Sequence, residues 1–544
     1  MLLRIACLIC LSALVTVARA GERKIPPLAQ TPPMGWNDWA HYRCGLSAQT
    51  VLANATALVK TGLASRGYKT VTLDDCWMQK TRDAAGNLQF DPQRFPRGIA
   101  PVAEAVHAMG LKFGIYEDAG YKTCGGYEGS GEPDGGGDNH FLQDARLFAS
   151  WGVDYLKLDG CNMYVPKGSS EVDAYRKAYG AESAALNSVG RPIVFSESAP
   201  AYFLDTPDWY DVLGWVGNYG SLWREGWDIE TFKPEHADTP RFHSVLWNYA
   251  YNIPLGRFQK PGRWNDPDFI IGGDQGMTLP ETRSQMALWS MMSAPLILSS
   301  DVDRLSSESL AVLENEAVIA VDQDPWGRMA TLVRRSPVMD ILFKPLSSGE
   351  YAVAVLNRDL TPLSVNVSAT DLGFSADPEC RLIATNLWTG VHRRDSSLLA
   401  MIASHDTEIW RIHPAPGCGV PARTGPITMT VNSSRHDIDS YSRCLEPDGT
   451  VGHCSGTPAE TWTVSADGSL KSAGRCLAST ARGSTLQRCS SSPAQHWRYA
   501  LSGNLINGAN KKCLSISLVN GEPASLTVSV CRHNQPNQVW SLPN

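Results

Sequence analysis

The stretch Val153-Asp-Tyr-Leu-Lys-Leu-Asp-Gly-Cys161 has the pattern of a short buried strand that ends in a polar turn. Because side chains alternate along a strand, Lys157 and Asp159 are expected on the same face. A cation this close to a carboxylate lowers the carboxyl pKa and donates hydrogen bonds to the charged form. Asp159 is therefore expected to be ionised and nucleophilic. Since Asp-Gly is also a common turn, a second interpretation, in which Asp159 only caps the next helix, stays open on this motif alone.

Similar β-branched or apolar runs alternate with helical patterns from about residue 28 to residue 325. This alternation predicts βα units and a parallel sheet. Eight units in about 300 residues favour a (β/α)8 barrel, whose active site lies at the carboxyl ends of the strands. A doubly wound open sheet is less suitable, because no Gly-rich phosphate loop follows Trp36. The strands are expected at Met34–Trp39, Thr70–Trp77, Lys112–Asp118, Val153–Gly160, Pro192–Ser198, Val212–Asn218, Tyr251–Phe258 and Ala294–Ser300.

Two β-rich domains are expected after the barrel. Short alternating strands predict an antiparallel β-sandwich domain over residues 326–417. Residues 424–544 then repeat one order of residues, in which Cys-Leu is followed by a second Cys and by a closing Trp. Three copies suffice to close a β-trefoil. The copies run from Cys444 to Trp462, from Cys476 to Trp497 and from Cys513 to Trp540.

The first 20 residues have the features of a signal peptide, so the barrel is expected over residues 21–325. Arg4 is basic, Ile5 to Val17 is apolar, and Ala18-Arg-Ala20 matches a cleavage site. The apolar run is too short to span a bilayer, so no membrane anchor is expected. Removal of Cys7 and Cys10 leaves twelve of the 14 cysteines, an even number that suits disulfides in an oxidising compartment. The product is expected to be secreted and extracellular.

Composition and short motifs exclude several classes of partner. The net charge of −7 comes without any Lys/Arg block, so nucleic acid is not expected as a partner. No His-Glu-x-x-His, Cys-x-x-Cys or EF-hand spacing is present, so neither a metal nor another cofactor is expected. Sequons at Asn54, Asn366 and Asn432 predict glycosylation in a eukaryotic host.

Two further acidic motifs lie near predicted strand ends. Asp74 and Asp75 cannot both face inward on a regular strand, so one is expected to bind a ligand and the other to bond backbone or cap. The motif Trp264-Asn-Asp-Pro-Asp268 predicts a rigid turn that delivers carboxylates to a pocket, although the same residues are ordinary in turns. Each motif is weak alone.

Taken together, the motifs resemble glycoside hydrolase family 27, the α-galactosidases and α-N-acetylgalactosaminidases. They follow the family's order along nearly the whole barrel: Pro33-Met-Gly-Trp-Asn-Asp-Trp39, Leu73-Asp-Asp-Cys-Trp77, Gly114-Ile-Tyr116, Tyr155-Leu-Lys-Leu-Asp-Gly-Cys161 and Trp264-Asn-Asp-Pro-Asp268. The resemblance implies a retaining exo-glycosidase that removes terminal α-D-galactosyl residues from oligosaccharides and polysaccharides by double displacement. Retention needs a nucleophile and an acid/base whose pKa is raised.

The resemblance assigns Asp159 as the nucleophile and Asp228 as the acid/base, because Asp228 follows Arg224 by four residues. Glu225 and Asp208 stay open as alternative acids. The resemblance also implies that Arg224 contacts the sugar or orients the acid. Further implied sugar-site residues are Trp39, Asp74, Asp75, Tyr116, Cys124, Lys157, Cys161, Ser198, Ala201 and Asp268. The implied disulfides are Cys44–Cys76, Cys124–Cys161, Cys380–Cys418, Cys444–Cys454, Cys476–Cys489 and Cys513–Cys531.

Substrate preference depends on the wall after the fifth strand. Ser198 and Ala201 are small, as in the α-N-acetylgalactosaminidases, whereas a bulky wall excludes an N-acetyl group. The tail resembles the ricin-B type β-trefoil of secreted microbial α-galactosidases, which favours galactose. α-N-Acetylgalactosaminidase activity is the alternative, and β-L-arabinopyranosidase side activity stays open.

The trefoil departs from the family that it resembles. An Asp directly after Cys-Leu usually holds a sugar hydroxyl, but here the residues are Glu446, Ala478 and Ser515. A structural cap is therefore favoured over a working lectin. A sugar-binding protein on an inactive barrel is the non-enzymatic alternative, and the intact catalytic pairs argue against it.

Overall fold

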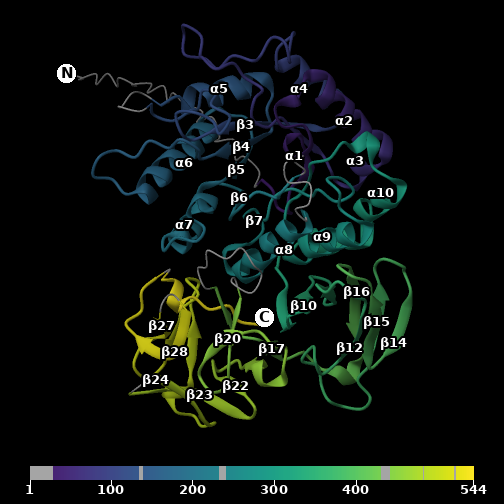
Figure 1. Cartoon of the computed structure of the whole chain (residues 1–544), viewed down its shortest axis with the longest axis vertical. Helices are drawn as coiled ribbons and strands as arrows, with labels where there is room; N and C mark the ends of the chain where they lie inside the picture. Colours follow the sequence, from purple (N-terminus) through teal and green to yellow (C-terminus); the bar gives the residue numbers. More distant parts are fainter. Residues whose placement is uncertain are drawn as a thin grey trace, which may run out of the picture.

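The protein is described by a computed structural model that covers residues 28–133, 139–231, 241–430, 442–481, 483–519, 522–533 and 535–543. The predicted signal peptide and the Asn432 sequon lie outside these residues. In Figure 1 the barrel forms one end of the molecule, and two β-rich domains lie side by side against it. None of the helices in the described ranges is both long and apolar enough to cross a bilayer.

The first domain is the expected (β/α)8 barrel, with a parallel sheet in the order β7-β6-β5-β4-β3-β2-β1-β8. A parallel bridge between Ile270 and Leu298 joins the segment after β7 to β8, so the sheet closes on itself. The strands are β1 Met34–Asn37, β2 Thr70–Thr72, β3 Lys112–Asp118, β4 Tyr155–Asp159, β5 Val194–Glu197, β6 Leu222–Arg224, β7 Trp264–Asp266 and β8 Leu296–Leu298.

Helices cover the outside of this barrel (Figure 1). They are α1 Trp39–Tyr42, α2 Ala48–Thr61, α3 Leu63–Arg66, α4 Ala100–Ala108, α5 Phe141–Trp151, α6 Glu171–Ser188, α7 Trp209–Val216, α8 Arg241–Asn252, α9 Leu279–Met292, α10 Ser307–Leu313 and α11 Glu316–Asp322. Local sequence explains their ends. The Thr278 side chain and Glu281 form a capping box at the start of α9, and Gly62 ends α2 in the left-handed conformation.

Two of the eight predicted strands are wrong. Residues 212–218 lie in α7 and the turn after it, because Trp209, Val212, Leu213 and Val216 recur at helical spacing and are all buried. Residues 253–258 form a 3-10 helix, η4, with a proline in its first turn. The real β6 and β7 each span three residues and lie outside the two wrongly predicted ranges.

The second domain is an antiparallel β-sandwich, as predicted. Its larger sheet has the order β14-β13-β16-β11-β10-β9, and β12 pairs with β15 in the other sheet. Helix α9 contacts β16 and β11, so this buried helix forms the seam between barrel and sandwich. The strands are β9 Thr331–Arg335, β10 Met339–Pro345, β11 Tyr351–Asn357, β12 Leu363–Ser368, β13 Leu382–Asn386, β14 His392–Asp395, β15 Ser397–Ile402 and β16 Thr407–Pro414.

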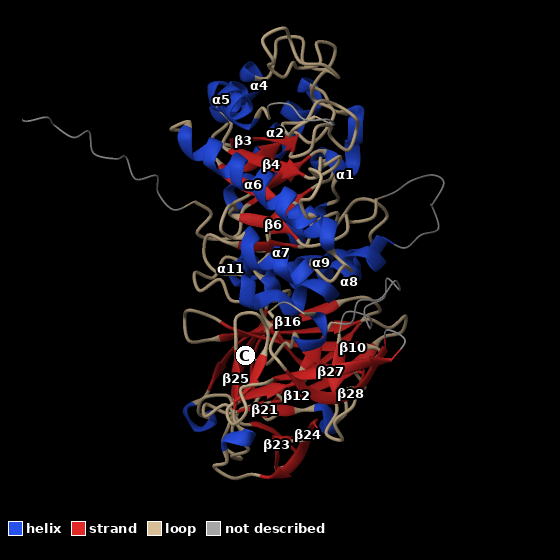
Figure 2. Ribbon diagram, turned by 90° about the vertical axis from the view of Figure 1, so that its left-hand side faces the viewer, coloured by secondary structure: helices blue, strands red, loops and turns tan. Residues whose placement is uncertain are grey.

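The third domain has the three-fold repeat that its sequence predicts. Trp462, Trp497 and Trp540 are buried, and each indole N–H donates to the backbone oxygen of the leucine in its own Cys-Leu pair. Figure 2 shows that both β-rich domains lie on the same side of the barrel. The strands are β17 Arg423–Gly425, β18 Thr428–Met429, β19 Arg443–Leu445, β20 Val451–His453, β21 Trp462–Val464, β22 Leu470–Ser472, β23 Arg475–Thr480, β24 Gly483–Arg488, β25 Trp497–Tyr499, β26 Leu505–Asn507, β27 Cys513–Val519 and β28 Glu522–Ser529.

The structure agrees with the predicted disulfides but not with one of the predicted glycosylation sites. All six cysteine pairs implied by the resemblance are disulfides. Asn366 is exposed on β12. Asn54, in contrast, is 2% exposed in α2, where it accepts from the Val302 N–H and donates to the Tyr42 hydroxyl. This burial contradicts the expectation of a glycan at Asn54.

Candidate active site

A pocket of about 880 Å³ opens where the carboxyl ends of β4, β5 and β6 meet. Asp159 ends β4, Arg224 ends β6, and Asp228 follows four residues later. Both predicted catalytic carboxylates line this pocket, and so do Ser198, Ala201 and the Cys124–Cys161 disulfide. The parallel strands bring together residues that are far apart in the chain, as the barrel prediction requires.

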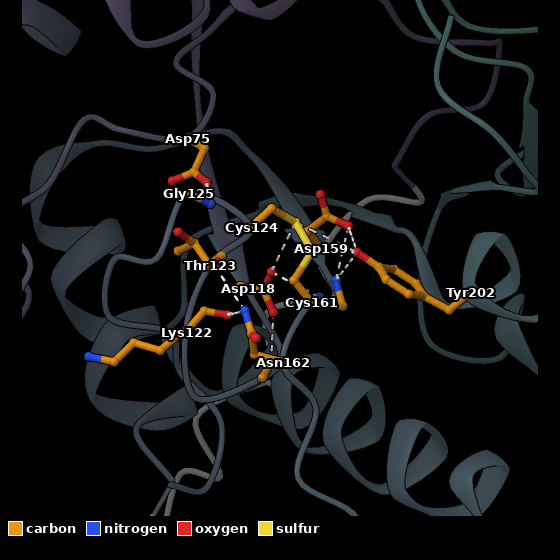
Figure 3. The surroundings of a disulfide bond; sticks show 12 residues. Asp75, Asp118, Lys122, Thr123, Cys124, Gly125, Asp159, Cys161, Asn162 and Tyr202 are labelled. Atoms are coloured by element: carbon orange, nitrogen blue, oxygen red, sulfur yellow. Dashed lines mark hydrogen bonds between the residues drawn. A yellow bond between two sulfur atoms is a disulfide. The ribbon is translucent and has the colours of Figure 1, made fainter. Parts of the chain in front are cut away.

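Asp159 is held by hydroxyl and backbone donors. The Tyr202 hydroxyl donates to Oδ1 over 2.6 Å, the Tyr116 hydroxyl to Oδ2 over 3.3 Å, and the Gly160 N–H to Oδ1 over 3.0 Å. Figure 3 shows the Tyr202 hydroxyl pointing at the Asp159 carboxylate, beside the Cys124–Cys161 disulfide. Burial, followed by the Asp159 charge, raises the pKa of Tyr202, so this hydroxyl keeps its proton and donates. Three donors therefore fix the orientation of the carboxylate.

Lys157 makes a different contact from the one that its spacing predicts. Its ammonium group donates to Asp74 Oδ2 over 2.7 Å, and no hydrogen bond to Asp159 is found among the described residues. Asn37 also donates to this oxygen of Asp74, over 2.8 Å. Burial alone would lower the pKa of Lys157, but the charges of Asp74 and Asp159 outweigh it and raise the pKa. Lys157 is thus a permanent cation that pairs with Asp74 and interacts electrostatically with Asp159.

Asp75 bonds backbone, the role expected for one member of the acidic pair. Its carboxylate accepts from the Cys76 N–H over 2.6 Å. It also accepts from the N–H of Gly125, which lies next to it in Figure 3, over 2.7 Å. Burial raises the pKa of Asp75 above its ordinary value. Both acids lie beyond the end of β2 rather than in a regular strand, so strand alternation does not decide which way they face.

Several predicted sugar-site residues lie deep in the barrel. Asp74, Tyr116, Lys157 and Asp268 are between 1% and 8% exposed. The Lys157 ammonium lies 5.2 Å from the centre of the Tyr116 ring. Trp39 begins α1, and the guanidinium of Arg43 lies 5.0 Å from the centre of its ring. None of these five predicted residues lines the pocket itself, although the Tyr116 hydroxyl donates to Asp159 and Asp268 pairs with Arg224.

Arg224 holds two carboxylates at once. It lies 3.0 Å from Asp228 and 3.0 Å from Asp268, whose side chains are 76% and 2% exposed. Enclosure acts to raise the pKa of Asp228, but this exposure weakens the effect, and the charges of Arg224 and Lys157 hold the pKa below its ordinary value. Burial raises the pKa of Asp268 to about 6 against the opposing Arg224 charge. The raised pKa expected of the acid is therefore not seen at Asp228, because Arg224 pairs with it.

The alternative acids are placed elsewhere. Glu225 is fully buried, where it accepts from the Asn252 side chain over 2.6 Å and from the Asp266 N–H over 2.8 Å. Asp208 is exposed next to the start of α7 and does not line the pocket. Of the three acids that the sequence leaves open, Asp228 alone shares the pocket with Asp159.

Family models match three successive parts of the chain. The model described as alpha galactosidase A matches residues 31–324, the alpha galactosidase C-terminal beta sandwich domain matches 337–412, and the ricin-type beta-trefoil lectin domain matches 440–540. The chain belongs to the alpha-galactosidase A family. It is a glycoside hydrolase with a C-terminal β-trefoil.

Individual relatives agree with this family. The chain is similar to alpha-galactosidase A of Aspergillus niger, with 38% identity over 96% of this chain and 94% of that protein. It is also 38% identical to the alpha-N-acetylgalactosaminidase of Gallus gallus, over 64% of this chain and 84% of that one. Among solved structures, the Saccharomyces cerevisiae alpha-galactosidase with raffinose has a TM-score of 0.61 and 26% identity, over 71% of this chain and 98% of that one.

Within this alpha-galactosidase fold, sequence reasoning missed the role of Tyr202. This residue directly follows Ala201 in the wall after β5, and its position next to Ala201 was the available signal. Asp118 lies near the sulfurs of Cys124 and Cys161, but their bond to each other removes the thiolates that a metal would need.

Proposed function

We propose that Asp159 attacks the anomeric carbon of a terminal α-galactosyl residue while Asp228 protonates the leaving oxygen. The observation that carries the proposal is the position of both carboxylates in one pocket, with Asp159 fixed by Tyr202 and Tyr116 and Asp228 by Arg224. The attack forms a galactosyl-enzyme ester, and Asp228 then takes a proton from the water that hydrolyses it. Two inversions leave the product in the α configuration.

The low pKa of Asp228 requires that substrate binding changes its surroundings. A bound sugar excludes water from this largely exposed side chain, and burial raises the pKa of a carboxyl group. The Arg224 guanidinium can also move away from Asp228 toward Asp268, which it already contacts. Both changes favour a protonated Asp228 when the leaving oxygen is in place.

The roles of the sugar-binding residues are proposed from the family resemblance and from the burial of their side chains. Asp74, Asp75, Lys157 and Asp268 hold the hydroxyl groups of the galactosyl ring. Trp39, Tyr116 and the Cys124–Cys161 disulfide form its apolar walls. Lys157 supports this arrangement, because its buried ammonium donates to Asp74 and is held in the charged form by Asp74 and Asp159.

We further propose that galactosylated oligosaccharides and polysaccharides are the substrates and that the enzyme is secreted. The predicted signal peptide supports export, as do the six disulfides, which persist in oxidising compartments. N-Acetylgalactosaminides are a second candidate, because Ser198 and Ala201 leave small side chains on the pocket wall.

One assay tests the proposal and separates its two candidates. Hydrolysis of nitrophenyl α-galactoside is compared with hydrolysis of the α-N-acetylgalactosaminide counterpart. We expect the higher kcat/KM for the galactoside. A preference for the N-acetyl sugar would assign the enzyme to the second candidate, and no hydrolysis of either would overturn the proposal.

A further inference from the structure

The active-site pocket is larger than a terminal sugar requires. Its volume of about 880 Å³ lies near the upper end of the roughly 300–1,000 Å³ range of pockets that enclose drug-sized ligands. Beyond the catalytic carboxylates, part of its wall comes from the segment after β6 and from α8. Trp227 and Trp247 are among the residues that line the pocket.

The backbone of Trp227 is firmly held, although its side chain is 48% exposed. Its carbonyl oxygen accepts from Arg224 over 2.9 Å and from the Asn248 side chain over 3.0 Å. The preceding Gly226 is closely packed, because a Cβ atom there would lie 2.7 Å from both Leu204 and Tyr251. The half-exposed indole is thus attached to a backbone segment that is held in place at the pocket.

The position of this indole relative to Asp228 suggests its ligand. The general acid must lie next to the leaving oxygen, so the first sugar of the leaving group occupies the space beside Asp228. Trp227 immediately precedes Asp228 and lines the same pocket. A rigid aromatic face offers a large contact area for the apolar C–H face of a sugar ring at little cost in conformational entropy.

We propose that Trp227 is the stacking platform for the first sugar of the leaving group. The enzyme thereby selects glycosidic leaving groups over small ones. This inference rests on the proposed function, since it takes Asp228 as the acid/base.

The test compares raffinose with α-galactosyl fluoride, whose leaving group carries no sugar. In Trp227→Ala, the ratio of kcat/KM for raffinose to kcat/KM for the fluoride should fall about tenfold, mainly through KM. Trp227→Phe should keep most of the ratio, because an aromatic face remains. Trp326→Ala is the matched control: Trp326 is 47% exposed, lies outside this pocket and should leave the ratio unchanged.

Two outcomes would overturn the inference. An unchanged ratio in Trp227→Ala would show that the indole does not contact the leaving group. A fall in kcat for raffinose with KM unchanged would show that the variant displaces Asp228 rather than removing a platform. If the wild-type enzyme hydrolysed neither substrate, the proposed function would fail instead.

Discussion

Asp159 owes its position to donors from three places in the chain. The spacing correctly predicts that Lys157 and Asp159 share strand β4, but Lys157 donates to Asp74 rather than to Asp159, and this partner could not be predicted from the motif. Asp74 lies 83 residues before Lys157, and Tyr202 lies 43 residues after Asp159. Contacts of this kind depend on barrel closure, which no local pattern describes. The family resemblance assigned Asp74 to the sugar site but assigned no role to Tyr202.

Replacement of Asp159 by asparagine tests the nucleophile. The change keeps the shape of the side chain and removes its charge, so kcat should fall more than about thousandfold while circular dichroism stays unchanged. Asp208→Asn is a matched control, because Asp208 is exposed outside the pocket and should retain full activity. Activity of Asp159→Asn within tenfold of the wild type would remove Asp159 from this role.

The acid role of Asp228 is tested by varying the leaving group. A sugar alkoxide needs a proton when it leaves, an effect often worth about 10² to 10⁴ in rate, whereas a nitrophenolate does not. Asp228→Ala should therefore slow a disaccharide far more than an aryl galactoside. The aryl substrate should show a burst, and added azide should accelerate its turnover and yield α-galactosyl azide. Equal losses for both substrates without an azide effect would reassign the acid.

Among the secondary-structure elements, strands β6 and β7 could not be predicted from the hydrophobic pattern of the sequence. Both are three-residue strands, and their identity depends on parallel neighbours in the sheet rather than on their own residues. Helix α7 was mistaken for a strand because its β-branched residues resemble a buried strand. The longer strands β3 and β4 were predicted closely, since they carry enough residues for a pattern. Helix ends with strong caps, such as that of α9, follow directly from sequence.

A buried ion pair inside the sandwich, to which α8 adds a hydrogen bond, should stabilise the junction of the two domains. Asp340 accepts from Arg335 over 2.6 Å and from the Tyr249 hydroxyl of α8 over 2.9 Å. Asp340→Ala leaves Arg335 buried without its partner, so stability should fall by about 3–5 kcal/mol, measured by denaturant unfolding. Asp371→Ala breaks the more exposed pair with Arg334 and should cost less than about 1 kcal/mol.

The direction in which the stability of the protein changes with pH follows from the pKa of Asp340. Burial acts to raise its pKa, but the charges of Arg335 and Arg358 outweigh burial and lower the pKa. Its contribution to stability is therefore present above the unfolded pKa of about 3.9 and is lost as the pH falls through the folded value. Asp340→Asn should show a weaker loss of stability in acid than the wild type. The same acid dependence in both proteins would contradict this assignment.

At the scale of the whole molecule, the three-domain order was predictable because each domain carries a distinct repeat or period. The trefoil repeat is visible in sequence, and its buried tryptophans explain why the spacing must be kept. Its packing against the barrel and the sandwich was not predictable. Gly503 approaches Arg257 of η4, and Gly425 approaches the backbone of Leu332. These contacts join surfaces whose residues show no pattern along the chain.

Removal of residues after about 420 tests what the trefoil does. The pocket is lined by barrel residues alone, so hydrolysis of nitrophenyl α-galactoside should stay within about threefold of the full chain. Thermal stability should fall, because apolar contacts around Ile253 and Leu332 become exposed. In the described trefoil, Ala478 and Ser515 are each 1% exposed, so the separated tail should not bind galactose. Measurable galactose binding by the tail would contradict the structural role.

The stereochemistry of the first product tests the central claim most directly. Proton NMR is recorded within the first minutes of hydrolysis of nitrophenyl α-galactoside, before the released sugar equilibrates between anomers. Double displacement through Asp159 predicts that α-galactose appears first and that the β-anomer grows in only by mutarotation. Initial appearance of β-galactose would contradict the account, because it requires direct attack by water rather than a covalent intermediate on Asp159.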